Sequence, residues 1–223
     1  MKRFSLTFIL LITCIFTVLG CSCNKEETVS KEKAVQVLED AKVNDNVTIT
    51  TTTETNVNGI KTVSTQTDTY YEDKYYHLSE SNNLSTKTWY GYVDNILYAF
   101  YYTKNANNEE IKTSSKIEAT QLESVKKQPS SIITNLFDEN NKLLENYEIS
   151  ATRKGSTYTI KINNNLEEES NIYTITIEDG KVIKIIKITS IASDTIKTTY
   201  DYSYKVSDIS LPNLNDYPLN ING

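Results

Sequence analysis

The sequence contains little of what a disulfide scaffold, a metal centre or a phosphate-binding loop requires. Its 223 residues include only 3 Cys and a single His, whereas a structural zinc site takes four Cys or His ligands. Glycine is scarce as well, with 6 residues, and no Gly-rich phosphate loop occurs. We therefore expect no metal, no cofactor and no catalytic residues.

The single His, His77, lies beside tyrosines in a segment of extended character. No nucleophile-elbow glycine pattern accompanies it, so a Ser-His-Asp or Cys-His site has no support in the sequence. We expect His77 to be a half-buried or surface residue of a sheet, and the protein not to be an enzyme. The net charge of -6 argues against a nucleic-acid partner, which requires a basic surface.

The N-terminus carries the first positive signal. Lys2 and Arg3 precede an apolar run that ends in VLGC at Cys21. The run is short for a membrane span, and its charge, its length and the small residue before the Cys resemble a bacterial lipoprotein signal. That resemblance implies cleavage after residue 20 and acylation of Cys21, for example with palmitate. An ordinary secretory signal or an uncleaved anchor is the alternative.

Acylation of Cys21 implies a protein anchored by lipid on the extracytoplasmic face of the cell membrane. Cys14 would leave with the leader and Cys23 would be the remaining thiol, so we expect no disulfide within the chain. The chain is long enough to bury its own core without such a bond. We also expect a monomer. The expected boundaries are a signal peptide at 1–20, a tether at 21–30, one β-rich domain at 31–212 and a tail at 213–223.

Beyond the tether, hydrophobic periodicity predicts a helix and then mostly strands. Ser30 can cap an amphipathic helix. Asn58-Gly59 predicts a two-residue hairpin turn, because both central residues of a type I′ turn need positive φ. About ten or eleven strands joined by hairpins predict one antiparallel sheet. The segment VIKIIKI, residues 182–188, does not keep one register, so either both of its faces are partly covered or a bulge shifts the pattern.

Aromatic residues concentrate in WYGYVDNILYAFYYTK, residues 89–104. If the chain turns at Asp94-Asn95, alternation divides this hairpin into two faces. We expect the more apolar face to be buried against helices, and the tyrosine-rich face to lie on the convex side of the sheet. The first face carries Trp89, Gly91, Val93, Ile96, Tyr98, Phe100 and Tyr102. The second includes Tyr90, Tyr92 and Tyr101.

The hydrophobic period becomes helical in the middle of the chain. Pro129 suits the first turn of a helix, and Ile132, Ile133, Leu136 and Phe137 recur after it at helical spacing. We expect a break near Asn140-Asn141 and a shorter helix near 122–127. The fold class is therefore mainly β (α+β), with a single curved sheet, a half-barrel, wrapped around two or three helices.

The order of elements resembles that of the lipoprotein-localisation-factor (LolA-like) superfamily, including lipidated carriers of the LppX type. These elements are a lipidated Cys, a tether, an amphipathic helix and a long meander with a helical insertion. The segments that carry the resemblance are 47–71, 89–102 and TTYDYSYKVSDISLP at 198–212. It implies a half-barrel with an apolar hollow for acyl chains between sheet and helices. No residue motif in the chain determines the cargo.

Two functions remain open from the sequence. The first is a membrane-anchored lipoprotein that binds an apolar or acyl-chain ligand in the hollow, unless the same side chains fill it as core. The alternative is a surface module that recognises a protein or glycan through exposed Tyr. The expected lining of the hollow is Trp89, Tyr98, Phe100, Ile132, Ile133, Leu136 and Phe137.

Overall fold

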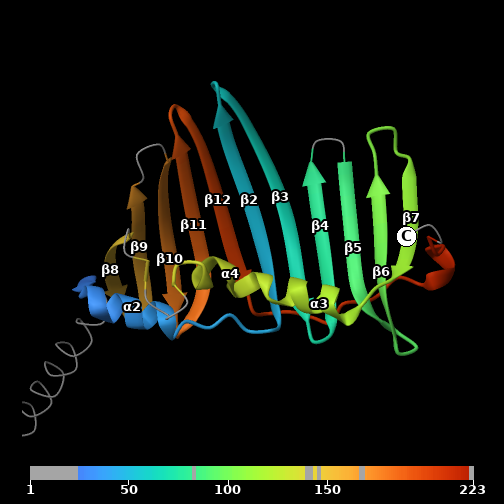
Figure 1. The fold of residues 1–223 in the computed structure, drawn as a ribbon, viewed down its shortest axis with the longest axis horizontal. Coiled ribbons are helices and arrows are strands. Elements are labelled where there is room, and N and C mark those ends of the chain that lie inside the picture. Colours follow the sequence, from blue (N-terminus) through green and yellow to red (C-terminus); the bar gives the residue numbers. More distant parts are fainter. Residues whose placement is uncertain (1–24, 82–83, 139–142, 145–146, 166–168, 221–223) are drawn as a thin grey trace, which may run out of the picture.

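The computed structural model describes residues 25–81, 84–138, 143–144, 147–165 and 169–220. In these ranges the strands form one antiparallel sheet, as predicted, with twelve strands where about ten or eleven were expected. Three α-helices lie against it (Figure 1). The strands are β1 (Glu27–Val29), β2 (Val47–Val57), β3 (Ile60–Tyr71), β4 (Lys74–Ser81), β5 (Leu84–Val93), β6 (Ile96–Lys104), β7 (Glu110–Lys116), β8 (Tyr147–Lys154), β9 (Thr157–Asn165), β10 (Glu169–Glu178), β11 (Lys181–Ile191) and β12 (Asp194–Ser203). The helices are α2 (Lys31–Glu39), α3 (Ala119–Lys126) and α4 (Gln128–Thr134), with a short 3-10 turn, η2, at Leu214–Asp216.

The sheet is built from two meanders that meet in its middle. The strand order is β1-β8-β9-β10-β11-β12-β2-β3-β4-β5-β6-β7, so β12 pairs with β2 where the meanders join. The helices α3 and α4 carry the chain from β7 at one edge back toward β8, across one side of the sheet (Figure 1). We call this side the helix face and the opposite side the outer face.

The turns explain why the hairpins form where the sequence predicts them. Asn58 and Gly59 have φ values of 50° and 79°, and Asp94 and Asn95 have 50° and 62°. These values are the positive φ that two-residue turns require. Trp89 consequently pairs with Phe100, which confirms the predicted register of the aromatic hairpin.

Two strands were not among those predicted. β1 lies inside the expected tether and pairs with β8 through only three residues, Glu27, Thr28 and Val29. β7 has the sequence EIKTSSK, in which apolar and polar residues do not alternate. Both are edge strands, where a polar sequence is common because one side of the backbone faces solvent.

The helices follow local sequence signals. The Ser30 side chain accepts a hydrogen bond from Lys33 N at 3.3 Å and caps α2. Pro129 lies in the first turn of α4, as predicted. However, α4 ends at Thr134, and the chain continues in tighter turns in which Leu136 N donates to Ile133 O at 3.0 Å. The predicted break near Asn140 lies outside the described residues. No helix in the described ranges is long and apolar enough to cross a bilayer.

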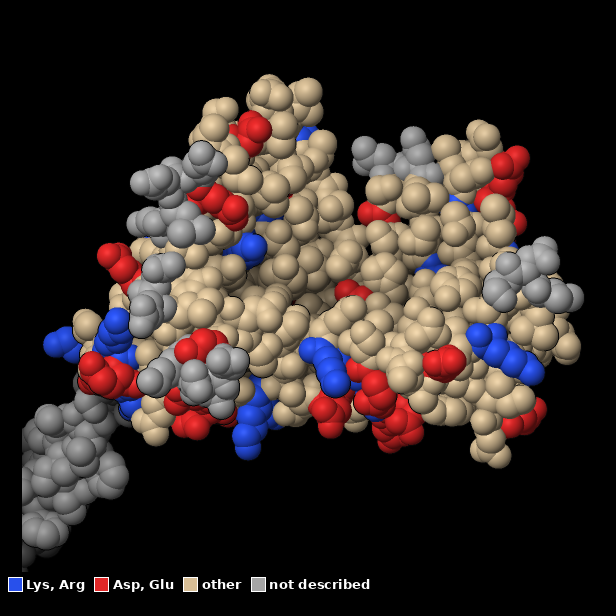
Figure 2. Space-filling model, viewed as in Figure 1, with Lys and Arg blue, Asp and Glu red and all other residues tan. Residues whose placement is uncertain are grey.

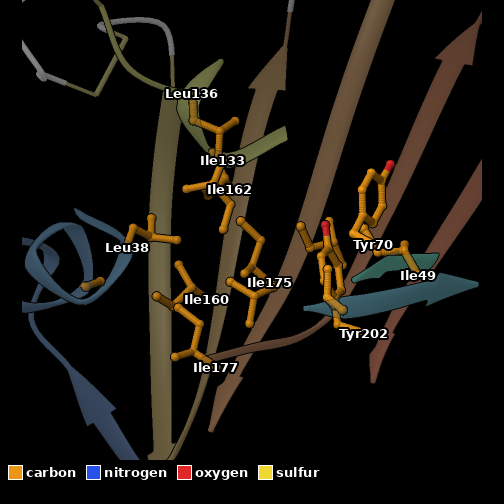
Figure 3. Close-up of a cluster of buried hydrophobic side chains, with 14 of the residues drawn as sticks. Leu38, Ile49, Tyr70, Ile133, Leu136, Ile160, Ile162, Ile175, Ile177 and Tyr202 are labelled. Atoms are coloured by element: carbon orange, nitrogen blue, oxygen red, sulfur yellow. The ribbon is translucent and has the colours of Figure 1, made fainter. Parts of the chain in front are cut away.

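The main core lies between the helix face and the three helices, and its aliphatic part lies under α2. Ile160 and Ile162 of β9 and Ile175 and Ile177 of β10 are buried beneath Leu38 of α2 (Figure 3). A register shift between Thr176 and Ile177 places an extra residue in β11, so the VIKIIKI ambiguity arises from a bulge. Burial of these aliphatic side chains is the main stabilising term for this half of the sheet.

A second, smaller core lies on the outer face. Phe100 is fully buried with Tyr98 and Tyr217, and Trp89 packs against them. The covering element is the C-terminal segment 204–220, which we call the C-terminal strap. The apolar face of the 89–102 hairpin therefore packs against the strap and not against the helices. Alternation shows which side chains share a face, but it does not show what covers that face.

Candidate functional site

A pocket of about 490 Å³ lies between α2 and α4, and apolar and polar groups contribute about equally to its exposed lining. We call it the apolar pocket to distinguish it from the more polar hollow described below. Its volume is within the usual range of small-molecule sites, roughly 300–1,000 Å³. Two buried side chains, Leu38 and Ile133, contribute to its wall, whereas Glu39 and Thr134 are exposed. The full lining is Leu38, Glu39, Ala41, Val43, Ser130, Ile133, Thr134 and Phe137.

Hydrogen bonds from the sheet hold both walls of this pocket. Lys42 N donates to Gly180 O at 3.0 Å, which ties the segment after α2 to the β10–β11 turn. The Tyr202 hydroxyl on β12 donates to Pro129 O at 3.2 Å and fixes the start of α4. In Figure 3, Leu38 approaches Ile160 from one side, and Ile133 and Leu136 lie beside Ile162.

A second, polar hollow lies where α4 faces β12, β2, β3 and their neighbours. Its first compartment measures about 220 Å³ and contains Asp68, Tyr70 and Tyr202. A second compartment of about 210 Å³ extends along the strands from there. The residues common to the two compartments are Thr51, Gln66 and Tyr200.

Asp68 is the charged residue of the polar hollow and is only 8% exposed. Its Oδ1 accepts a hydrogen bond from the Tyr75 hydroxyl at 2.7 Å and lies 2.8 Å from Nδ1 of His77. Burial, reinforced by the Asp68 carboxylate, raises the pKa of Tyr75 far above its ordinary value. Tyr75 is therefore a neutral donor, and its bond to Asp68 offsets part of the cost of burying that carboxylate.

Tyrosines line much of the remaining hollow. Burial raises the pKa of Tyr70 and of Tyr202, with smaller contributions from Asp68 and from neighbouring tyrosines respectively. Both phenols stay protonated at neutral pH and can donate as well as accept hydrogen bonds. Tyr70 and Tyr202 lie together with Ile49 on adjacent strands (Figure 3).

The residues predicted to line one apolar hollow are divided among several places. Ile133 and Phe137 line the apolar pocket, Ile132 lines the polar hollow, and Leu136 is buried in the main core. On the other side of the sheet, three residues form the cluster under the strap and contribute to neither cavity. These residues are Trp89, Tyr98 and Phe100.

The predicted tyrosine patch is not on the convex side either. Tyr90 and Tyr92 pair with Ala99 and Leu97, and Leu97 belongs to the helix-side core. Tyr92 and Tyr101 remain 45% and 38% exposed. Burial raises the pKa of Tyr90, with a further contribution from Tyr101.

Some residues of both sites escaped prediction although signals for them exist. Leu38 lies on the buried side of α2, and Ala41 follows the end of that helix by two residues. Helical spacing from Ala34 gives both positions as apolar. Asp68 precedes Tyr70 by two residues and therefore shares its face of β3. A carboxylate at an inward position of a strand is a signal of a polar site. Among the described residues, no cluster of His, Cys, Asp or Glu suited to a metal ion occurs.

Comparisons with known proteins add only a distant structural likeness. No family model and no curated protein matches the sequence. Among solved structures, a DUF1329 family protein from Desulfovibrio piger aligns over 82% of this chain and 95% of its own, with 8% identity and a TM-score of 0.31. At that TM-score the likeness assigns neither a family nor a function to this chain.

Proposed function

We propose that this protein is an extracytoplasmic lipoprotein, anchored through Cys21, that binds an apolar or acyl-chain ligand in the pocket between α2 and α4. The observation that carries the proposal is the pocket of about 490 Å³ walled by Leu38, Ile133 and Phe137. The basic and apolar leader before Cys21 supports the anchor and the location. The protein acts by binding and not by catalysis.

The chemistry of the pocket matches a ligand with an apolar body and a polar end. Aliphatic and aromatic side chains form one part of the wall, and Glu39, Ser130 and Thr134 form the polar part. Glu39 and Thr134 are exposed, so polar groups lie where the pocket meets solvent. Transfer of an acyl chain from water to such a wall is favourable by about 0.8 kcal/mol for each buried CH₂ group. A chain of several methylenes would therefore gain a few kcal/mol from the apolar part of the wall alone.

A photoactivatable palmitoyl glycerol, whose neutral head adds no anion beside Glu39, tests this proposal on the full chain in lipid nanodiscs. Ala41→Phe places a ring in the pocket and should reduce labelling about tenfold, a loss equivalent to about 1.4 kcal/mol. The matched control is Ala119→Phe, at an exposed position of α3. It should label like the parent. In the parent, cross-linked peptides should map to residues 38–43 and 130–137.

Two results would contradict the proposal. One is equal labelling of the two Phe variants with both folded by circular dichroism. The other is cross-linking that maps to the strap cluster around Phe100 and Tyr217, on the opposite face of the sheet.

A further inference from the structure

The floor of the polar hollow is a regular grid of hydrogen-bonding side chains. Because Tyr200, Thr51, Gln66 and Ser79 are direct cross-strand partners, they form one row over β12, β2, β3 and β4. Parallel rows lie two residues away along each strand. In a sheet this gives a spacing of roughly 4.8 Å within a row and roughly 6.7 Å between rows. The rows on either side are Tyr202, Ile49, Asp68 and His77, and Thr198, Thr53 and Ser64.

The charge of this lining excludes anionic ligands. Among the described residues that line the two compartments, Asp68 is charged and none is Lys or Arg. A phosphate or carboxylate would meet Asp68 without a cationic partner, whereas such ligands are bound by Arg, Lys or clustered N–H groups. The wider helix face above the helices is also largely uncharged, with charged side chains concentrated below the helices and near the strand tips (Figure 2).

The polarity of the lining excludes a purely apolar ligand as well. Hydroxyls of Thr, Ser and Tyr and the amides of Gln66 and Gln128 dominate both compartments. An apolar ligand would remove water from these groups without replacing its hydrogen bonds, at a cost of about 1–3 kcal/mol for each group. The ligand must itself carry many donors and acceptors.

We infer that the polar hollow binds a neutral oligosaccharide. Sugar hydroxyls can exchange hydrogen bonds with the grid of Thr, Ser and Gln side chains. Tyr200, Tyr202 and Tyr70 offer ring surface for the C–H groups of a pyranose and hydroxyls for its edge. The two connected compartments suit consecutive sugar units.

A compact organic cation fits the arrangement less well. The Asp68 Oδ1 that would attract a cation already has Tyr75 and His77 as partners. A cation would also leave unused the row from Tyr200 to Ser79 and the second compartment beyond it. The extent of the grid therefore favours an extended neutral chain.

Saturation-transfer NMR with the full chain in nanodiscs tests this inference, with empty nanodiscs as the blank. The probes are chitohexaose, maltohexaose and cellohexaose. At least one should give a saturable signal, and Tyr200→Ala should weaken its affinity about tenfold by removing a ring common to both compartments. Gln66→Ala, at an exposed residue, should weaken it without risk to the fold. The matched control Tyr71→Ala, on the outer face, should bind like the parent.

Several outcomes would overturn the inference. These are no saturable signal from any of the three hexasaccharides, parental affinity in both Tyr200→Ala and Gln66→Ala, or displacement of the sugar by choline chloride at equal concentration. Ala41→Phe fills the apolar pocket on the other side of α4 and should leave sugar binding unchanged. Failure of the acyl-chain proposal and failure of this inference are therefore distinguishable.

Discussion

Phe100 and Tyr101 are neighbours on β6 in opposite surroundings. Phe100 has no exposed surface and its ring meets Tyr217 edge-on at 5.7 Å, whereas Tyr101 is 38% exposed. Phe100→Ala should lower the free energy of unfolding by about 3–5 kcal/mol. Tyr101→Ala should lower it by about 1 kcal/mol or less. Urea unfolding of the full chain in nanodiscs, followed by fluorescence of the single tryptophan, Trp89, measures both values.

The two variants also test why Phe100 is buried. Fluorescence of Trp89 reports directly on the strap cluster, because its ring lies 6.1 Å from that of Tyr217. Phe100→Ala should therefore lose stability whether or not an acyl ligand is present, since Phe100 lines neither cavity. Equal destabilisation by the two substitutions would be inconsistent with the observed register.

At the scale of elements, the strap depends on a close approach between Leu211 and the backbone of β5. A Cβ atom at Gly91 would lie 2.6 Å from Leu211 Cδ1, which is too close for two carbon atoms. Gly91→Ala should therefore destabilise the protein by about 1–3 kcal/mol through overpacking. In a Leu211→Ala background the same substitution should cost at least about 1 kcal/mol less, and the double-mutant cycle measures this coupling. Additive costs would mean that Leu211 does not lie over Gly91 in solution.

The elements divide into those that local sequence determines and those that depend on long-range packing. Asn58-Gly59 and Asp94-Asn95 determine their turns locally, because few residues adopt the positive φ that the turns need. The faces of each strand then follow from alternation. Alternation does not show which segment covers each face, because Leu211 and Tyr217 lie more than a hundred residues from the hairpin that they cover. Asp68 and His77 are a different case, because they are nine residues apart and are direct partners in the β3–β4 hairpin. Their contact depends on the exact position of the turn at Glu72, where φ is 51°.

At the scale of the molecule, the sheet has different covers on its two faces. On the helix face, the apolar pocket and the polar hollow flank α4. On the outer face, the strap covers a small core. The strap is joined to the edge strand β7 where Ser114 N donates to Pro218 O at 2.9 Å and Asn220 N donates to Ser114 O at 2.8 Å. These bonds satisfy edge groups of β7 that would otherwise be open to another chain.

The opposite edge of the sheet begins close to the proposed anchor. Glu27, the first residue of β1, follows Cys21 by six positions in the sequence. A fully extended chain advances at most about 3.6 Å per residue, so Glu27 can lie no farther than roughly 22 Å from the Cys21 backbone. Acylation of Cys21 would therefore keep the β1 edge near the membrane surface. The tether expected at residues 21–30 is shorter than predicted, because β1 begins at Glu27.

Metabolic labelling with an alkynyl palmitate tests the anchor itself. Cys21→Ala should abolish labelling of the full chain, because Cys21 follows the small residue Gly20 at the end of the apolar run. Cys23→Ala is the matched control and should be labelled like the parent. Cys23 is a poor acylation site, because a signal ending there would have Gly20 at the position that normally holds a branched apolar residue. Labelling is a sharper readout than membrane fractionation, because an uncleaved leader could retain the variant on the membrane without lipid. Label that persists in Cys21→Ala, or that disappears in Cys23→Ala, would refute acylation at Cys21 and with it the proposed position of the β1 edge.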